Sequence, residues 1–481
     1  MIKPLSEQYV SFLHDESRLA GEAADISFPR TVEEVKTIVS QCFSLNKPIT
    51  VQGARTGICG GATPRRGHLM NLSEMNRPLN LIRDDEGTFY LTVQPGYLLS
   101  GLRRDLRTRR FEWMIPDLVD AVALADFSQA PEQFWPPDPS ELTASIGGIA
   151  STNGRGPGAF KYGSAANFIS SLQAVMVDGE AREIKDDWEL LDAFLGGEGM
   201  FGVITALTLR LQPKPEQMWG ICFFFNDENQ AGGFIDQTAA AGLPALAALD
   251  FLDEESLTLA GDLKLVAAKL KEMPDTPKKA KAAVYIELHG QSEEEIETAA
   301  QELMETAETF GSDPDTSWAL SGDETEKLRL FRHAVPEAAN TRLDQIRLDF
   351  PGAIKMGGDL TLPGISFVES LNRYRRDIND SGLQAVVFGH ARDNHLHVNL
   401  LPKNKGELQT AADLMAAWLD YSRELKGQLF REHGVGKIKS GLFLNHEQPE
   451  VIQSRRELKA RLDPDGLWNP GNMFQEGSRC E

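Results

Sequence analysis

The sequence has 481 residues, of which 41% are hydrophobic and 25% are charged. These proportions are ordinary for a globular protein, and they exclude a chain that is disordered throughout, a collagen-like repeat and a disulfide-stapled miniprotein. The 71 acidic residues outnumber the 49 basic ones and give a net charge of −22, which argues against nucleic acid and anionic lipid as partners because both are negatively charged.

The first 210 residues alternate between helix-like and strand-like segments. Thr31 and Glu34 form a capping-box pattern in front of apolar residues at helical spacing, which predicts a helix from about residue 32. Strand-like runs lie at residues 47–52, 89–94, 172–177 and 203–211. The Asp178-Gly179 pair is typical of a hairpin turn, and Pro213 marks a domain boundary.

The rest of the chain has a different pattern. Residues 282–326 contain 13 acidic residues and no lysine or arginine, and an amphipathic helix with a solvated acidic face is expected over residues 292–310. Its apolar face would contain Ile296, Ala299, Ala300, Leu303 and Met304. Strands are expected at residues 385–388 and 396–401, followed by a long helix from about residue 407 to 431.

Glycine-rich loops give the first chemical signal. Residues 52–62 place four glycines just after a strand, where backbone N–H groups can surround a pyrophosphate without interference from a Cβ atom. Residues 136–154 combine turn residues, hydroxyls and paired glycines, and are expected to form a strand or loop that runs against a flat group. A GxGxxG string at residues 197–202 is rejected as a dinucleotide fingerprint, because a helix precedes it and a strand follows it.

Histidines give the second signal. Three of the nine histidines, His390, His395 and His397, fall within eight residues. Alternation along a strand places His395, His397 and Asn399 on one face. Because a Glu-His pair follows at residues 432–433, the cluster favours a metal site over isolated structural histidines.

Several of these motifs occur in the order and spacing of a known flavin fold. They are the segments 31–35, 53–61, 93–96, 146–148, 152–154, 177–179 and 199–204. Together they resemble the FAD domain of the vanillyl-alcohol oxidase/p-cresol methylhydroxylase superfamily. The histidine motif at 389–399 and Asn469-Pro-Gly471 resemble its D-lactate/glycolate/D-2-hydroxyglutarate dehydrogenase branch.

The resemblance implies an α+β fold with a two-subdomain FAD-binding domain, an α+β cap domain that carries the substrate pocket, and a C-terminal helical segment that returns to the FAD domain. The expected bounds are 1–213, 214–430 and 431–481. FAD would lie extended between the two subdomains. The residues assigned to FAD are Gln52, Gly53, Ala54, Arg55, Thr56, Gly57, Gly60, Gly61, Pro95, Gly96, Pro137, Asp138, Thr143, Gly147, Gly148, Ser151, Asn153, Gly154, Tyr162, Gly163, Gly199, Gly202, Val203, Ile204 and Asn469.

The mode of FAD attachment is predicted from the first glycine loop. Some relatives bond FAD to a histidine of this loop, but here the loop contains none. His68, a few residues on, is too weakly placed to nominate. Non-covalent FAD is therefore expected.

The resemblance makes His390, His397 and Glu432 the ligands of a divalent metal. A set of two histidines and a carboxylate with an open position suits Zn²⁺, with Mn²⁺ or Fe²⁺ as alternatives. Arg392 stands where the motif has glycine, and His395 also departs from it. His395 is therefore either an additional ligand or a residue that points away.

The resemblance also assigns residues to the substrate. His433 is the first candidate for the base that accepts the hydroxyl proton, and His395 is the second. Asn399 and His433 would line the pocket. Arg332 matches the branch's substrate-contacting arginine, and Lys355 is similar to a second cation although its spacing is longer by two residues.

These implications predict an FAD- and metal-dependent dehydrogenase that oxidises a D-2-hydroxy acid, with D-lactate favoured because a small substrate needs only the metal, one cation and the base. Since the chain has no iron–sulfur motif and no nicotinamide site, electrons would pass to an external quinone, electron-transfer flavoprotein or iron–sulfur subunit. The alternatives are a D-2-hydroxyglutarate or glycolate dehydrogenase, an oxidase that uses O₂, an alkyl-glycerone-phosphate-synthase-like transferase, and a non-catalytic flavin subunit of a larger complex.

Location is predicted from what the sequence lacks. No apolar run approaches the roughly 18 residues of a membrane span, and the N-terminus has no signal-peptide pattern. The four cysteines are scattered and form no CxxC pair, which fits a reducing compartment. We expect a cytoplasmic protein without a transmembrane segment, with a peripheral position at the inner face of the membrane as an alternative and a homodimer as one option for its assembly.

Overall fold

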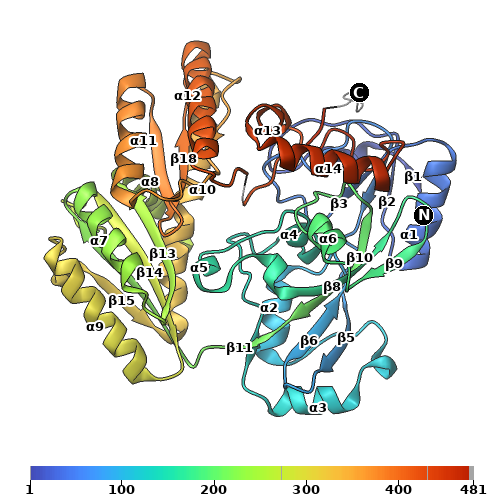
Figure 1. Cartoon of the computed structure of the whole chain (residues 1–481), viewed down its shortest axis with the longest axis horizontal. Coiled ribbons are helices and arrows are strands. Elements are labelled where there is room, and N and C mark those ends of the chain that lie inside the picture. Colours follow the sequence, from blue (N-terminus) through green and yellow to red (C-terminus); the bar gives the residue numbers. More distant parts are fainter. Residues whose placement is uncertain (1, 272, 431, 476–481) are drawn as a thin grey trace. The chain divides into compact units, whose positions relative to one another are not determined.

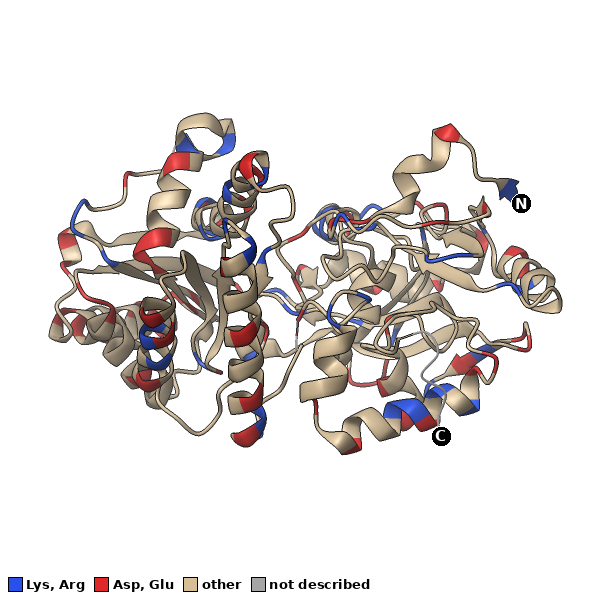
Figure 2. Cartoon of the chain, turned by 90° about the horizontal axis from the view of Figure 1, so that it is seen from above, with Lys and Arg blue, Asp and Glu red and all other residues tan. Residues whose placement is uncertain are grey.

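The computed structural model describes residues 2–271, 273–430 and 432–475, which form two compact units (Figure 1). Unit 1 comprises residues 1–156, 162–214 and 432–481, and unit 2 comprises residues 157–161 and 215–431. The chain therefore leaves unit 1, builds most of unit 2 and returns to unit 1. Acidic and basic residues are spread over the helices of both units (Figure 2). Arg431, the expected end of the long helix, lies outside the described residues.

The first sheet of unit 1 has the strand order β1-β2-β4-β3, in which β2, β4 and β3 run parallel. Its strands are β1 (Lys3–Pro4), β2 (Asp25–Ser27), β3 (Ile49–Gln52) and β4 (His68–Asn71). Helix α1 (Val32–Ser44) begins after Thr31, whose hydroxyl accepts a hydrogen bond from the Glu34 N–H at 3.2 Å. The predicted helix and its cap are therefore confirmed.

The second sheet of unit 1 is antiparallel and has the order β5-β6-β10-β8-β9. Its strands are β5 (Pro78–Arg83), β6 (Phe89–Val93), β8 (Ile169–Val175), β9 (Ala181–Ile184) and β10 (Val203–Arg210). Gly179 has a φ of 77° in the turn between β8 and β9, which confirms the predicted hairpin. Strands β7 (Gln133–Phe134) and β11 (Gln212–Pro213) form a separate pair.

Short helices connect these strands. They are α2 (Leu99–Thr108), α3 (Ala121–Gln129), α4 (Ile146–Ser151) and α6 (Trp188–Phe194), with 3-10 helices at Glu7–Leu13, Pro116–Leu118 and Ala165–Phe168. Most of helix α5 (Ala159–Tyr162) belongs to unit 2, which includes residues 157–161. Helix α6 precedes the GxGxxG string and β10 follows it, so the reason for rejecting a dinucleotide fingerprint is confirmed.

The last segment of the chain completes the core of the first sheet. After α13 (Ser440–His446) and α14 (Pro449–Leu462), Trp468 forms a parallel bridge with Ile49 of β3. The Trp468 ring is fully buried and lies 4.8 Å, centroid to centroid, from the ring of Phe43 in α1. The parallel sheet therefore depends on residues from both ends of the chain.

Unit 2 is built on one antiparallel sheet with the strand order β15-β12-β14-β13-β17-β18-β16. Its strands are β12 (Gln217–Phe225), β13 (Leu246–Asp253), β14 (Ala282–Gly290), β15 (Trp318–Ser321), β16 (Met356–Gly357), β17 (Ala385–His390) and β18 (His395–Leu400). Its helices are α7 (Glu228–Ala241), α8 (Glu254–Val266), α9 (Glu293–Thr309), α10 (Thr325–Asp349), α11 (Phe367–Ser381) and α12 (Lys405–Glu424), with 3-10 helices at Ala268–Leu270, Pro314–Thr316 and Gly322–Glu324.

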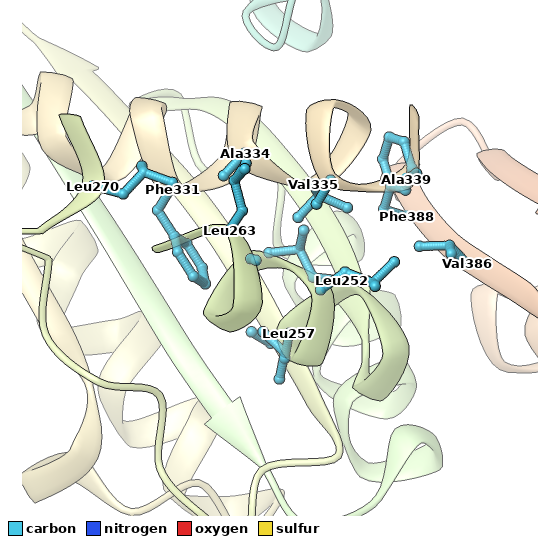
Figure 3. Close-up of a cluster of buried hydrophobic side chains, with 14 of the residues drawn as sticks. Leu252, Leu257, Leu263, Leu270, Phe331, Ala334, Val335, Ala339, Val386 and Phe388 are labelled. Atoms are coloured by element: carbon cyan, nitrogen blue, oxygen red, sulfur yellow. The ribbon is translucent and has the colours of Figure 1, made fainter. Parts of the chain in front are cut away.

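Helices cover both faces of this sheet. On one face, Leu263 of α8 and Phe331 and Val335 of α10 pack with Leu252 of β13 and Phe388 of β17 (Figure 3). On the other face, aromatic contacts join α7 and α11 to the strands, in the pairs Phe223–Phe234, Phe225–Phe234 and Phe251–Phe367. Together the two units confirm the predicted α+β class. Among the described residues, no helix is long and apolar enough to cross a bilayer.

The apolar face of α9 differs from the prediction at one position. Met304 is 42% exposed, whereas Ala307 is buried. At about 100° per residue, Met304 lies about 80° around the helix from Ile296, and Ala307 lies only about 20° away. The buried stripe therefore continues through Ala307.

The end of the long helix also differs from the prediction. Helix α12 ends at Glu424, not near residue 431. Lys426 adopts a left-handed φ of 59°, and a Cβ at Gly427 would lie 2.1 Å from the carbonyl oxygen of Thr361. This turn stops the helix, so Glu432 follows an irregular segment and does not lie at a helix end.

Candidate active site

Three loops that the sequence assigns to FAD meet in unit 1, and glycine makes their approach possible. A Cβ at Gly53 would lie 2.2 Å from the hydroxyl oxygen of Ser145. A Cβ at Gly147 would lie 2.6 Å from the Cβ of Pro95. Any larger side chain at these positions would push the loops apart.

The second glycine-rich stretch corrects the expectation of a strand or loop. Part of it forms helix α4, because the Ser145 hydroxyl caps the first turn by accepting a hydrogen bond from the Gly148 N–H at 3.2 Å. Ile146 and Ile149 are buried. The paired glycines therefore bring a helix, not a strand, against the Pro95 loop.

Asn469 connects β3 to the GxGxxG loop. Its Oδ1 accepts a hydrogen bond from the Val51 N–H at 2.7 Å, and its Nδ2 donates to the carbonyl oxygen of Glu198 at 2.8 Å. A Cβ at Gly199 would lie 2.2 Å from Asn469 Nδ2, so glycine is needed there. Asn469 thus holds in place loops to which FAD is assigned.

Two buried charged residues of unit 1, Glu198 and Lys437, were not among the predicted site residues. The Glu198 carboxylate accepts hydrogen bonds from the N–H groups of Val435 and Gly436, both at 2.6 Å. Burial raises the pKa of Glu198, and these two N–H groups oppose the rise. Lys437 Nζ donates to Asn472 Oδ1 at 2.6 Å and to two carbonyl oxygens of the first glycine loop. Polar contacts therefore hold the returning chain against loops that the sequence assigns to FAD.

Several predicted FAD residues use their side chains inside unit 1. Gln52 Nε2 donates to the carbonyl oxygens of Phe12 and Ala62, both at 2.7 Å, and so braces its loop. The guanidinium carbon of Arg55 lies 4.4 Å from the centroid of the Phe12 ring. Thr143 bonds to Glu141 within its own turn. The remaining candidates in unit 1 are Ala54, Thr56, Gly57, Gly60, Gly61, Gly96, Pro137, Asp138, Ser151, Asn153, Gly154, Tyr162, Gly163, Gly202, Val203 and Ile204.

His68 is engaged within the first sheet. It is fully buried on β4, with Nδ1 2.5 Å from Asp25 Oδ1 and Nε2 2.7 Å from the hydroxyl oxygen of Ser27. Burial lowers the pKa of His68, and Asp25 opposes this effect. Both ring nitrogens have partners in the sheet, which supports a structural role.

The three clustered histidines lie together on adjacent strands of unit 2. His390 ends β17 and pairs opposite His395 of β18, which also carries His397. The ring centroids are 5.7 Å apart for His390 and His395, 5.9 Å for His390 and His397, and 4.9 Å for His395 and His397. A Cβ at Gly389 would lie 2.8 Å from the carbonyl oxygen of His395, so glycine permits this approach.

A buried aspartate joins the cluster to the predicted substrate arginine. Asp250 of β13 is 1% exposed, and its Oδ1 lies 2.8 Å from His390 Nδ1. Its Oδ2 accepts a hydrogen bond from Arg332 Nε of α10 at 2.7 Å. Burial alone would raise the pKa of Asp250, but charge attraction from His390 and Arg332 lowers it below its ordinary value. Asp250 therefore stays ionised between two polar groups of the candidate site.

His395 has a carboxylate partner of its own. Its Nε2 lies 2.9 Å from Asp359 Oδ1, and both side chains are buried. The carbonyl oxygen of Asp359 accepts a hydrogen bond from the Phe430 N–H at 2.7 Å. With Nε2 engaged in this way, a role for His395 as ligand or base would fall to its Nδ1 atom.

A second arginine lies one turn before Arg332 on α10 and belongs to a different ion pair. Arg329 Nε and Nη2 lie 2.9 Å and 2.5 Å from the two carboxylate oxygens of Glu287. Glu287 also accepts a hydrogen bond from the Tyr285 hydroxyl at 2.5 Å. Burial alone would raise the pKa of Glu287, but the Arg329 guanidinium holds it well below its usual range.

The remaining predicted substrate residues lie in both units. In unit 2, Lys355 Nζ donates to Asn340 Oδ1 at 2.7 Å. Asn399 is buried on β18, and its Nδ2 donates to the carbonyl oxygen of His397 at 3.3 Å. Glu432 and His433 open the last segment of unit 1. Their place in the site stays a prediction.

The rings of the two predicted histidine ligands are close enough for both to reach one divalent ion. Imidazole nitrogens bind Zn²⁺ at about 2.0–2.1 Å, which keeps the centroids of two rings on one ion within about 6.5 Å of each other. The 5.9 Å between the rings of His390 and His397 satisfies this limit. The contact between His390 Nδ1 and Asp250 would direct Nε2 toward a metal, which is the usual arrangement for metal-binding histidines.

The chain matches two family models. Residues 214–473 match the model described as FAD linked oxidases, C-terminal domain, and residues 24–125 and 119–185 match the model described as FAD binding domain. Glycolate oxidase subunit GlcD of Bacillus subtilis is 28% identical over 94% of this chain and 89% of its own. D-lactate dehydrogenase of Anaerostipes hadrus is 25% identical over 96% of this chain and 92% of its own.

Solved structures of 16% sequence identity share the fold. p-Cresol methylhydroxylase with substrate bound aligns with a TM-score of 0.72 over 100% of this chain and 95% of that chain. Alkyldihydroxyacetonephosphate synthase aligns with a TM-score of 0.67 over 94% of this chain and 78% of that chain. Together with the two family models and the curated relatives, this shared fold confirms the resemblance to the vanillyl-alcohol oxidase/p-cresol methylhydroxylase superfamily.

Proposed function

Because the chain belongs to the family of FAD-linked oxidases, we propose that it oxidises a D-2-hydroxy acid, with D-lactate favoured, to the 2-oxo acid. It is an FAD-linked oxidoreductase of the glycolate and D-lactate dehydrogenase type. The observation that carries the finer proposal is the set of contacts from His390 through Asp250 to Arg332. One buried carboxylate holds an imidazole suited to a metal and a guanidinium suited to a substrate carboxylate.

Different residues of the chain would have different roles in the reaction. Bound FAD supplies the hydride acceptor, and a bound divalent ion supplies a positive charge that lowers the pKa of the substrate hydroxyl. Arg332 would orient the substrate carboxylate, and Asn399 would line the pocket. His433 would accept the hydroxyl proton, with His395 as the second candidate. Loss of that proton and of the α-hydride converts the hydroxy acid to the 2-oxo acid.

His390, His397 and Glu432 would hold the ion. Glu432 is included because the Glu-His pair at residues 432–433 resembles the Glu-His-Gly motif of the dehydrogenase branch.

A small monocarboxylate suits the charges of unit 2. Arg329 could bind a second carboxylate of a larger substrate, but its two-point pair with Glu287 already balances its charge. This supports D-lactate over D-2-hydroxyglutarate. Glycolate is the second candidate, because the Bacillus subtilis relative is named for it.

We further propose that FAD is bound without a covalent link and passes electrons to an external quinone, electron-transfer flavoprotein or iron–sulfur subunit. The first glycine loop contains no histidine, and both ring nitrogens of His68 have partners within its own sheet. Acid precipitation should release all yellow colour into the supernatant as FAD. Colour that stays in the pellet would contradict non-covalent binding.

The test of the substrate is anaerobic mixing of the FAD-loaded protein with D- and L-lactate, glycolate and D-2-hydroxyglutarate while flavin bleaching is recorded. D-lactate should bleach the flavin fastest. Faster bleaching by L-lactate would contradict the stereochemical assignment, and faster bleaching by glycolate would move the assignment to the second candidate. A flavin that none of these acids bleaches would overturn the proposed activity.

A further inference from the structure

Asp250 occupies a central position in the polar part of unit 2. In the strand register it lies opposite His390 of β17 on one side and opposite Tyr285 of β14 on the other. It is almost completely buried, and each of its two oxygens faces a different element. Oδ1 contacts the His390 ring, and Oδ2 contacts Arg332 of α10.

The chemistry of a carboxylate decides what these contacts do. An ionised carboxylate only accepts hydrogen bonds, so a neutral His390 must carry its proton on Nδ1 to bond with Asp250. The other nitrogen, Nε2, then presents its lone pair, which is the form that binds a metal. On the other oxygen, the bond to Arg332 Nε fixes the plane of the guanidinium and therefore the direction of its other N–H groups.

We propose that Asp250 is a positioning residue that sets both halves of the candidate site. It fixes the proton of His390 on Nδ1, so that Nε2 binds the metal, and it fixes the orientation of Arg332 toward the substrate carboxylate. This inference rests on the proposed function, because it assigns His390 to the metal and Arg332 to the substrate.

A purely structural ion pair would behave differently. Loss of such a pair would lower stability, but it would leave the affinity of the folded site for a metal unchanged. An amide in place of the carboxylate provides the distinction, since its NH₂ group can donate to His390 Nδ1 and so favour a proton on Nε2. That tautomer cannot bind a metal through Nε2.

The experiment compares Zn²⁺ affinity in the FAD-loaded full-length protein and its Asp250→Asn variant, by competition with a chromogenic chelator. The variant should bind Zn²⁺ roughly 10- to 100-fold more weakly, the usual range for loss of a carboxylate behind a metal-binding histidine. Its KM for D-lactate should also rise, because Arg332 loses its charged partner. A Zn²⁺ affinity within twofold of wild type would overturn the proposal.

Asp25→Asn is the matched control. It makes the same chemical change at a carboxylate that faces a buried histidine, His68, within unit 1. Its Zn²⁺ affinity should equal that of wild type, whereas an equal loss in both variants would mean that the effect is general and would overturn a specific role of Asp250.

A second measurement needs no Asp250 variant and so covers the case in which Asp250→Asn does not fold. Nitrogen-15 NMR of histidine-labelled, Zn²⁺-loaded wild type should show a proton on Nδ1 of His390, identified by its loss in His390→Gln. A proton on Nε2 would overturn the proposal. Failure of the proposed function is recognised separately, because wild type itself would then neither bind Zn²⁺ nor bleach with a D-2-hydroxy acid.

Discussion

The candidate sites of the two units depend on different kinds of residues and contacts. In unit 1 the loops that the sequence assigns to FAD meet through the main chain, and the residues that permit this approach, such as Gly53 and Gly147, lack a Cβ atom. In unit 2 the decisive residues are buried charges, Asp250 with Arg332 and Glu287 with Arg329. A site of the first kind should fail by steric exclusion, and a site of the second kind should fail when one charge loses its partner.

Removal of the metal should have the largest effect on activity. It should also distinguish the site of unit 2, which would lose its function, from the site of unit 1, which would not. Protein treated with a chelator should keep its FAD, because no metal is assigned to the glycine loops. Flavin reduction by D-lactate should fall at least about 100-fold, since a bound ion contributes several kcal/mol to the reaction. Stopped-flow absorbance measures the rate, and added Zn²⁺ or Mn²⁺ should restore it. Full activity in protein that elemental analysis shows to be metal-free would contradict the metal site.

Glu287→Gln should cost about 3–5 kcal/mol of unfolding free energy at neutral pH, because it removes the buried carboxylate that pairs with Arg329. The pKa of Glu287 is lower in the folded state than its ordinary value of 4.5. Its contribution to stability is therefore fully present above pH 4.5 and is lost as the pH falls through the lowered folded pKa. Urea denaturation of both proteins should show a difference that is largest near pH 7 and shrinks below about pH 4.5. A difference that does not change with pH would show that Glu287 does not act through its charge.

Gly147→Ala should weaken FAD binding, because the new Cβ would lie 2.6 Å from the Cβ of Pro95. Overpacking of this kind costs about 1–3 kcal/mol, which corresponds to roughly 10- to 100-fold in affinity. FAD retention during dialysis measures the effect. Gly261→Ala in α8 of unit 2 is the control, since the added Cβ would meet no atom within 4 Å outside its chain neighbours and its own helix backbone. Equal FAD retention in the two variants would show that close approach of the loops is not what binds FAD.

Arg332→Lys should have the smallest of these effects. Lysine keeps the positive charge near Asp250 but loses the planar guanidinium, so the fold should be retained while carboxylate binding weakens. The KM for D-lactate should rise about tenfold, which is the loss of affinity expected when a two-point hydrogen-bonded contact with a carboxylate is removed. Steady-state kinetics give KM, and an unchanged KM would move the substrate contact to another cation, with Lys355 the next candidate.

The parts of the fold that the sequence predicts are those determined locally. Thr31 caps α1 because a hydroxyl and a glutamate stand three residues apart, and Gly179 turns the β8–β9 hairpin for the same kind of local reason. The end of α12 could not be found in this way. It depends on Gly427 packing against Thr361, a residue far away in the chain.

The same distinction applies to the candidate site. The histidine cluster is visible in the sequence because three of its members are close together, but Asp250 and Glu287 lie on other strands. One signal could have found them. Each is an acidic residue in the interior of a mostly apolar strand, and carboxylates are rarely buried unless they are paired. The partners of Asp250 and Glu287 depend on the strand register and on the position of α10. Neither of these can be read from a local sequence pattern.

The bridge between Ile49 and Trp468 has a consequence for synthesis of the protein on the ribosome. Strand β3 and helix α1 emerge early, yet the indole that covers them is translated only after residues 215–431. At 5–20 residues per second, that intervening stretch takes roughly 10 to 40 s to make. During this time unit 2 can fold as a nearly continuous segment. The apolar surface of α1 and β3 that Trp468 later covers stays exposed to solvent. Nascent chains that end before Trp468 should therefore be the ones that chaperones hold.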